Sequence, residues 1–115
     1  MNRYEVRSNL CGGEGQVILE HLLSPEQMDG KCGLYARVTI PAGSSLGYHP
    51  HHGESETYFI LSGLGEYSEG SASAASGQRV VRPGDVTFTP DGAGHGLKNI
   101  GGEPLVFMAL IILGE

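Results

Sequence analysis

The sequence has no tryptophan, few charged residues and only two cysteines, and these shortages exclude several classes of protein. Charged residues make up 17% of the 115 residues and hydrophobic residues 39%, so the chain lacks the excess charge that keeps disordered proteins unfolded. Lys and Arg number 7 against 13 Asp and Glu, which leaves a formal net charge of −6. Because no Lys/Arg cluster offsets this charge, nucleic acids and anionic membrane surfaces would be repelled. We expect neither as a partner.

The sequence also lacks a recognisable targeting or membrane-spanning segment. The first ten residues, MNRYEVRSNL, are too polar for a signal peptide. The longest apolar run, Leu105 to Leu113, is too short to cross a bilayer. We therefore expect a cytoplasmic protein, in which Cys11 and Cys32 are free thiols because they form no CxxC pair. Both lie far in the sequence from the histidines, which argues against a role in metal binding.

Helix signals are scarce, whereas strand signals recur along the whole chain. Ser24 to Gly30 could form at most a turn or two, with Ser24 as the N-cap. Segments rich in β-branched and aromatic residues, or alternating with period two, are predicted as strands, separated by Gly/Pro turns: 16–23, 34–40, 57–61, 79–82, 86–89 and 105–113. This pattern predicts an all-β sandwich or barrel, and 115 residues suit one domain over 1–115. The Ser/Ala/Gly-rich stretch from Ser68 to Gly77 is expected to be a flexible hairpin loop.

The last predicted strand, Leu105 to Leu113, is apolar on both faces. A strand with one face in water would alternate between apolar and polar residues. One face should therefore meet the core, and the other should meet a second subunit or an N-terminal strand of the same chain. We expect a homodimer formed through the flanking strands, including 105–113.

A cluster of titratable residues lies between Gly47 and Gly63, in the segment GYHPHHGESETYFILSG. His49 and His51 are two residues apart, so on a strand their imidazoles would share one face. If Glu56 and the distant His95 converged on them, the four groups could hold a divalent transition metal at roughly 2.0–2.2 Å. A His-rich loop alone is only a compositional hint of metal binding, and most single histidines ligate nothing.

Neighbouring residues leave alternatives open. His52 has the opposite strand phase to His49 and His51 and should point away, although a β-bulge would re-aim it toward the site. Glu54 is expected in a solvated loop. Tyr58 shares the phase of Glu56 and could line a cavity or serve as a core aromatic residue, whereas Lys98 is out of phase with His95 and should face away.

Two longer patterns include these candidate ligands. The first, G-x5-H-x-H-x4-E-x6-G, runs from Gly43 to Gly63, and the second, G-x5-P-x-G-x2-H-x3-N, runs from Gly84 to Asn99. Together they resemble the two motifs of the cupin superfamily, in the family's order. The resemblance implies a double-stranded β-helix, or jelly-roll barrel, comprising one cupin domain over 1–115 with core motifs 43–63 and 84–99. It also implies four metal ligands: His49, His51, Glu56 and His95. Gly63, Gly84 and Gly92 are expected mainly as turn residues.

The implied site suggests a chemistry but not a substrate. Three neutral imidazoles and one carboxylate around a divalent ion leave a local charge of about +1, which would attract a carboxylate, enolate or hydroxy-keto group as a bidentate ligand. Fe, Mn, Ni, Zn, Co and Cu all accept this ligand set. We expect a metal-dependent enzyme acting on a small oxygen-rich molecule, an oxidoreductase (dioxygenase), isomerase, decarboxylase or lyase, with the metal as Lewis acid or O₂ activator. The alternative is a non-catalytic module that binds or senses a sugar or organic acid, and a purely structural dimer fits the motifs least well.

Overall fold

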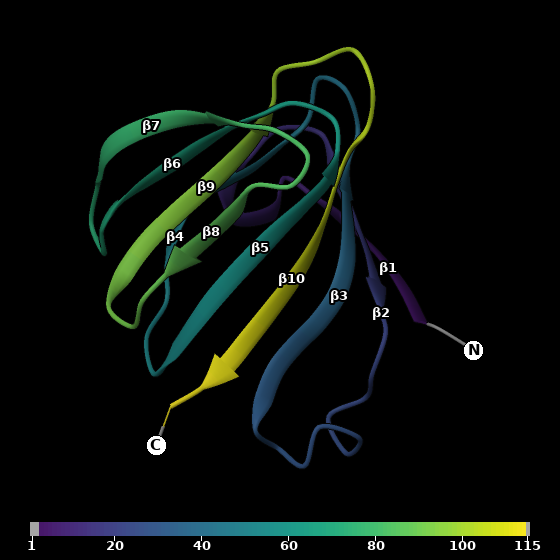
Figure 1. Ribbon diagram of the computed structural model, residues 1–115, viewed down its shortest axis with the longest axis vertical. Helices are drawn as coiled ribbons and strands as arrows, with labels where there is room; N and C mark the ends of the chain where they lie inside the picture. The colour runs from purple at the N-terminus through teal and green to yellow at the C-terminus, as the bar shows by residue number, and fades with distance from the viewer. Residues whose placement is uncertain (1–2, 115) are drawn as a thin grey trace.

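The computed structural model describes residues 3–114, which form two antiparallel β-sheets that enclose a common interior (Figure 1). The elements in chain order are β1 (Arg3–Ser8), the 3₁₀ turn η1 (Leu10–Gly12), β2 (Gln16–His21), β3 (Cys32–Ile40), β4 (Ser45–Pro50), β5 (Glu54–Ser62), β6 (Gly65–Ser71), β7 (Ala75–Val81), β8 (Val86–Thr89), β9 (Ala93–Asn99) and β10 (Leu105–Leu113). One sheet has the order β1-β2-β3-β10-β5-β8 and the other β4-β9-β6-β7. This arrangement is a jelly roll, and it confirms the predicted all-β fold class.

The core lies between the two sheets and follows the period-two pattern of the strands. In β3, Ala36, Val38 and Ile40 are buried, and each pairs with a buried residue of β10. The four-stranded sheet contributes Tyr67 and Leu97 to the same cluster. Each sheet thus buries one apolar face against the other, which is how two sheets of this kind form a core.

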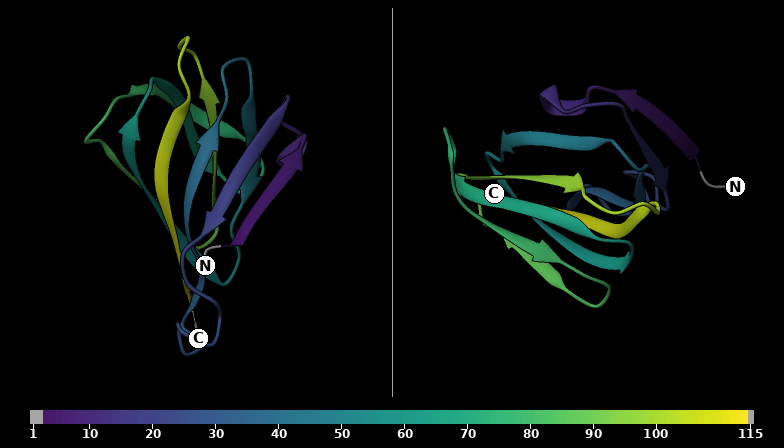
Figure 2. Two further views of the ribbon diagram at one scale, coloured as in Figure 1. Left: turned by 90° about the vertical axis from the view of Figure 1, so that its right-hand side faces the viewer. Right: turned by 90° about the horizontal axis from the view of Figure 1, so that it is seen from above.

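Strand β10 lies in the middle of the six-stranded sheet, hydrogen-bonded to β3 on one side and β5 on the other. Its inward residues belong to the core, while Val106, Met108 and Leu110 alternate with them and keep only partial exposure. Strands β1 and β2 extend the same sheet at its edge and do not cover its outer face (Figure 2). The predicted alternative, that an N-terminal strand covers this face, is therefore wrong.

The stretch from Ser68 to Gly77 is not a flexible loop. Strands β6 and β7 pair from Gly65 opposite Val81 to Gly70 opposite Ala75, and only residues 72–74 form the turn. The pairing uses backbone groups, which small residues supply as well as large ones. Because β7 is an edge strand with mostly exposed side chains, it needs little apolar packing. Strands β1, β4, β6 and β9 were also absent from the segments predicted as strands.

The predicted helical turn at Ser24 to Gly30 forms as a single turn without becoming a helix. The Ser24 hydroxyl accepts a hydrogen bond from the Gln27 amide at 3.2 Å, and the Gln27 side chain accepts one from the Ser24 amide at 2.9 Å. This reciprocal pair is a capping box, but Asp29 and Gly30 take positive φ values and end the turn. No helix within residues 3–114 has the length and hydrophobicity needed to cross a membrane.

The segment that contains η1 packs against β4 through close backbone contacts. The Ser45 amide donates to the Glu14 carbonyl at 2.9 Å, and the Glu14 amide donates to the Ser45 hydroxyl at 2.9 Å. A Cβ atom added to Gly47 would lie 2.1 Å from the Cys11 carbonyl oxygen, and one added to Gly13 would lie 2.2 Å from the Ser45 carbonyl oxygen. Glycine at these two positions is therefore what allows the two segments to approach.

Substituting Gly47→Ala should lower the free energy of unfolding by about 1–3 kcal/mol, because the new methyl group must displace the η1 backbone. Urea denaturation followed by circular dichroism measures this change. Gly77→Ala is the matched control, since an added Cβ there meets no atom within 4 Å and should not destabilise the protein. Equal stability of the Gly47→Ala and Gly77→Ala variants would contradict the close packing of η1 on β4.

Candidate metal centre

The structure brings the four predicted ligands together. The ligand atoms of His49, His51, Glu56 and His95 all lie within 4.8 Å of one another. His49 on β4 is the direct cross-strand partner of His95 on β9, and His51 follows the end of β4. Glu56 comes from β5 in the opposite sheet. The group therefore joins the two sheets across the interior.

A β-bulge in β4 gives the histidines their orientation. Leu46 pairs with Leu97 and His49 pairs with His95, so β4 has one residue more than β9 between the two pairs. The extra residue reverses the phase of the strand, and Leu46 and His49 both face the interior although they are three residues apart. The sequence contains no clear signal for this bulge.

The remaining two histidines lie outside the group. His52 is exposed while its neighbour His51 is buried, which agrees with the opposite strand phase predicted for it. His21 lies on β2 and contacts a carboxylate oxygen of Glu5 at 2.9 Å. Lys98 is exposed, as predicted.

The distances between the donor atoms fit a single cation. Glu56 Oε1 lies 2.9 Å from His51 Nε2 and 3.0 Å from His95 Nε2, and the two Nε2 atoms are 2.9 Å apart. Two ligands bound at right angles about 2.1 Å from a metal ion are separated by about 3.0 Å. The three atoms therefore have the spacing of three neighbouring positions around an octahedral ion, and His49 supplies the fourth donor. The chemistry of this donor set fits a divalent transition metal.

Hydrogen bonds on the far side of two imidazole rings set which nitrogen faces the centre. His49 Nδ1–H donates to the Gly47 carbonyl oxygen at 2.7 Å, and His51 Nδ1–H donates to the Glu54 carboxylate. Both partners can only accept, so the neutral rings carry their proton on Nδ1 and present the Nε2 lone pair to the centre. Glu54 was expected in a solvated loop, and its role was missed. The available signal was its position three residues after His51.

His95 is held by three buried side chains, of which only Tyr58 was singled out from the sequence. Its Nδ1 lies 2.7 Å from the Thr89 hydroxyl and 3.0 Å from the Tyr67 hydroxyl. On the other side, the Tyr58 ring stacks on the imidazole with centroids 4.8 Å apart, and the Tyr58 hydroxyl is 3.3 Å from Nε2. All four side chains are buried, so His95 has little freedom to move.

The protonation of the group follows from burial and mutual contacts. Burial lowers the pKa of His49, which favours its neutral form. The hydrogen bond to Glu56 raises the pKa of His51, and the contact with Glu54 adds to this effect. Burial acts to raise the pKa of Glu56, but the hydrogen bonds from His51 and His95 outweigh it and the net pKa is lowered. These contacts favour the protonated form of His51 and the charged form of Glu56.

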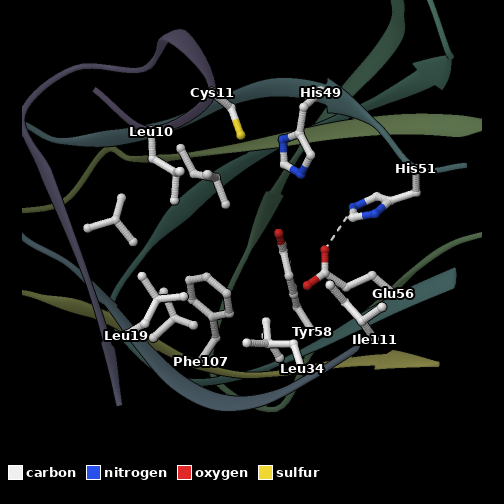
Figure 3. A pocket seen from close by; sticks show the side chains of 14 residues that line it. Leu10, Cys11, Leu19, Leu34, His49, His51, Glu56, Tyr58, Phe107 and Ile111 are labelled. Atoms are coloured by element: carbon white, nitrogen blue, oxygen red, sulfur yellow. Dashed lines mark ion pairs between the residues drawn. The ribbon is translucent and has the colours of Figure 1, made fainter. Parts of the chain in front are cut away.

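The side chains of His49, His51, Glu56 and His95 are together called the donor group. A cavity of about 140 Å³ adjoins it and is partly open to solvent. His49, His51 and Glu56 line one part of it, and Tyr58 contributes to the wall (Figure 3), which confirms that Tyr58 lines a cavity. Burial raises the pKa of Tyr58 well above its ordinary value, so its hydroxyl stays protonated and can donate to a ligand.

Both cysteines are free thiols, as predicted, but Cys11 lies closer to the site than its place in the sequence suggested. The η1 turn brings its side chain into the cavity wall (Figure 3). Cys11 is not part of the donor group. Its position shows that separation along the chain was a poor guide to distance from the histidines.

Comparisons with known proteins find a matching family, related sequences and a closely similar crystal structure. The sequence model of the family described as "Cupin domain" matches residues 36–111. An oxalate-binding protein of Thermotoga maritima is 43% identical over 106 residues, which are 92% of this chain and 84% of that protein. The crystal structure of a predicted oxalate decarboxylase from Thermotoga maritima superposes with a TM-score of 0.90 at 42% identity, covering 97% of this chain and 93% of that one. An oxalate decarboxylase of Bacillus subtilis is 31% identical over 75 residues, 65% of this chain but only 20% of that enzyme.

Replacing Glu54 by Gln should weaken the binding of Zn²⁺ about tenfold or more, because the charged acceptor that orients His51 is lost. The affinity is measured at pH 8 by competition with a chromophoric chelator. Glu26→Gln removes one exposed acid that is far from Glu54 in the sequence. This variant is the control, and its affinity for Zn²⁺ should be unchanged. A Glu54→Gln variant that binds Zn²⁺ as tightly as the parent would show that Glu54 does not support the site.

Proposed function

Because the chain belongs to the cupin family, we propose that it holds one divalent transition metal through His49, His51, Glu56 and His95 and binds a small carboxylate-bearing molecule at that metal. The observation that carries this proposal is the spacing of 2.9–3.0 Å among three donor atoms drawn from both sheets. The Thermotoga maritima relative is described as an oxalate-binding protein, and this description supports the proposed carboxylate ligand.

The surrounding residues suit such a ligand. Four protein donors leave open positions at a six-coordinate ion, which as a Lewis acid would accept two oxygens of one molecule. The protonated hydroxyl of Tyr58, next to His95, can donate a hydrogen bond to a ligand oxygen. The mainly apolar wall limits the access of water, which strengthens polar contacts inside the cavity.

Binding without turnover is the better-supported form of this function. Among the described residues that line the cavity, the titratable side chains are the donors themselves, Tyr58 and Cys11. Burial raises the pKa of both Tyr58 and Cys11, so neither serves readily as a general base near pH 7. A metal-dependent enzyme, such as a decarboxylase or dioxygenase, is the second candidate. It is favoured by the similarity to the oxalate decarboxylase.

Purified protein should contain about one transition-metal ion per chain by elemental analysis after loading, because four donors are present. His49→Ala and His95→Ala should each lose most of this metal. His52→Ala, which removes an exposed imidazole from the same segment, should retain it. A parent protein that holds no stoichiometric metal under any loading would end the proposal. Release of CO₂ from oxalate by the loaded protein would favour the enzyme over the binding module.

We also propose that a second copy of the chain covers the outer face of the six-stranded sheet. Large apolar side chains that alternate with inward-facing residues are exposed on this face: Tyr4, Val6, Phe59, Val86 and Phe88. The charged pair Arg37 and Glu20, 2.9 Å apart, lies on the same face. This face is apolar and locally neutral, so two chains of net charge −6 can meet there, and a two-fold axis would make the contact self-complementary.

Phe88→Lys should convert the dimer to a monomer, because it places like charges on both sides of the contact. Sedimentation velocity at about 50 µM measures the change. Val80→Lys on the edge strand β7 replaces another exposed apolar residue, in the other sheet, and should leave the dimer intact. A monomeric parent protein, or a Phe88→Lys variant that remains dimeric, would contradict this interface.

A further inference from the structure

The cavity is divided into a polar end and an apolar end. His49, His51 and Glu56 lie on one side, and the opposite side is formed by aliphatic and aromatic groups that include Leu10, Leu19, Leu34 and Phe107 (Figure 3). Phe107 is fully buried, and the three leucines are partly buried and pack against the core. A ligand whose head is bound at the donor end would therefore place its remaining atoms against a wall of hydrocarbon.

The cavity also has no partner for a second negative charge. No Lys or Arg is among the described residues that line it, and the acid that lines it is Glu56. Burial raises the pKa of the Cys11 thiol, so this group contributes no charge either. A carboxylate placed at the apolar end would lose its hydration without an opposite charge or a hydrogen-bond donor, which is strongly unfavourable.

The size of the cavity limits the apolar part of the ligand. Its volume is about 140 Å³, close to that of engineered cavities of about 150 Å³ that accommodate benzene. The ligand therefore has on the order of six to ten non-hydrogen atoms. If the head is a carboxylate with an oxygen on the adjacent carbon, about five of these atoms belong to it, and an arm of about one to five carbons fills the remainder.

From these three observations we infer that the ligand is a small monocarboxylate with a second oxygen on the adjacent carbon, such as a 2-oxo or 2-hydroxy acid, and that it carries an uncharged hydrocarbon arm. This inference rests on the proposed metal site, which would bind the two oxygens. According to this inference, the cavity prefers such an acid to oxalate, because oxalate has no hydrocarbon arm to bury and carries a second carboxylate.

Isothermal titration of the Zn²⁺-loaded protein with a series of acids tests the inference. Pyruvate, 2-oxobutanoate and 4-methyl-2-oxopentanoate share one head and differ in the arm. The dissociation constant should fall about fourfold for each buried CH₂ group, or roughly 60-fold across the series. The dianion 2-oxoglutarate, similar in size to the last of these acids, should bind at least about tenfold more weakly than 4-methyl-2-oxopentanoate.

Two variants test the location of the arm. Leu34→Arg places a cation at the apolar end and should reverse the preference between 4-methyl-2-oxopentanoate and 2-oxoglutarate. Leu23→Arg adds the same charge at an exposed position outside the cavity and should leave the preference unchanged. In the parent protein, titration with 4-methyl-2-oxopentanoate should shift the ¹³C-methyl resonances of the cavity leucines in preference to that of Leu23.

The outcomes separate this inference from the function on which it depends. If the loaded protein binds oxalate but its affinity does not rise with the length of the arm, the inference is wrong and the proposed function stands. If the protein retains no metal, or binds none of these acids, the proposed function fails together with the inference. A rising series that the Leu34→Arg variant reverses and the Leu23→Arg variant does not would support the inference.

Discussion

The contact of Glu56 with His51 and His95 is the constraint on which the rest of the structure depends. It places a carboxylate from one sheet within 2.9–3.0 Å of imidazole nitrogens carried by the other, inside an interior that is mainly apolar. Such a group is stable only if its charges are balanced, by a shared proton or by a cation. A cation at this position would link the two sheets directly, so metal binding would be coupled to the stability of the fold.

Two parts of the chain shape the site in different ways. Strands β4, β5 and β9 and the residue His51 after β4 supply the donors. Gly47, Glu54, Thr89 and Tyr67 orient the imidazole rings. Residues of η1, β2, β3 and β10 supply the hydrocarbon wall across the cavity. The chemistry available at the centre and the shape of the ligand are thus set by residues that hardly overlap.

The sequence predicted the convergence of His49, His51, Glu56 and His95 because its two motifs contain both their spacing and the turn glycines. Strand pairing places His49 opposite His95 and holds His51 beside Ala93, which follows the Pro-Asp-Gly turn. Glu56 comes from the other sheet and reaches them through the packing of the two sheets. Features set by contacts between distant segments were not predictable. The approach of Cys11 to Gly47 depends on backbone contacts with no sequence period, and the bulge in β4 has no residue signature. The β6–β7 hairpin was mistaken for a loop because side-chain composition says little about a strand held by its backbone at a sheet edge.

The packing of η1 on β4 has a consequence for relatives of this chain. The stretch that matches the cupin family begins at residue 36, whereas Leu10, Cys11, Val17 and Leu19, which form part of the cavity wall, precede it. The segment that faces the four site residues could therefore be exchanged while His49, His51, Glu56 and His95 are kept. Chimaeras that swap only the first two dozen residues would change the wall of the cavity and leave the four site residues in place.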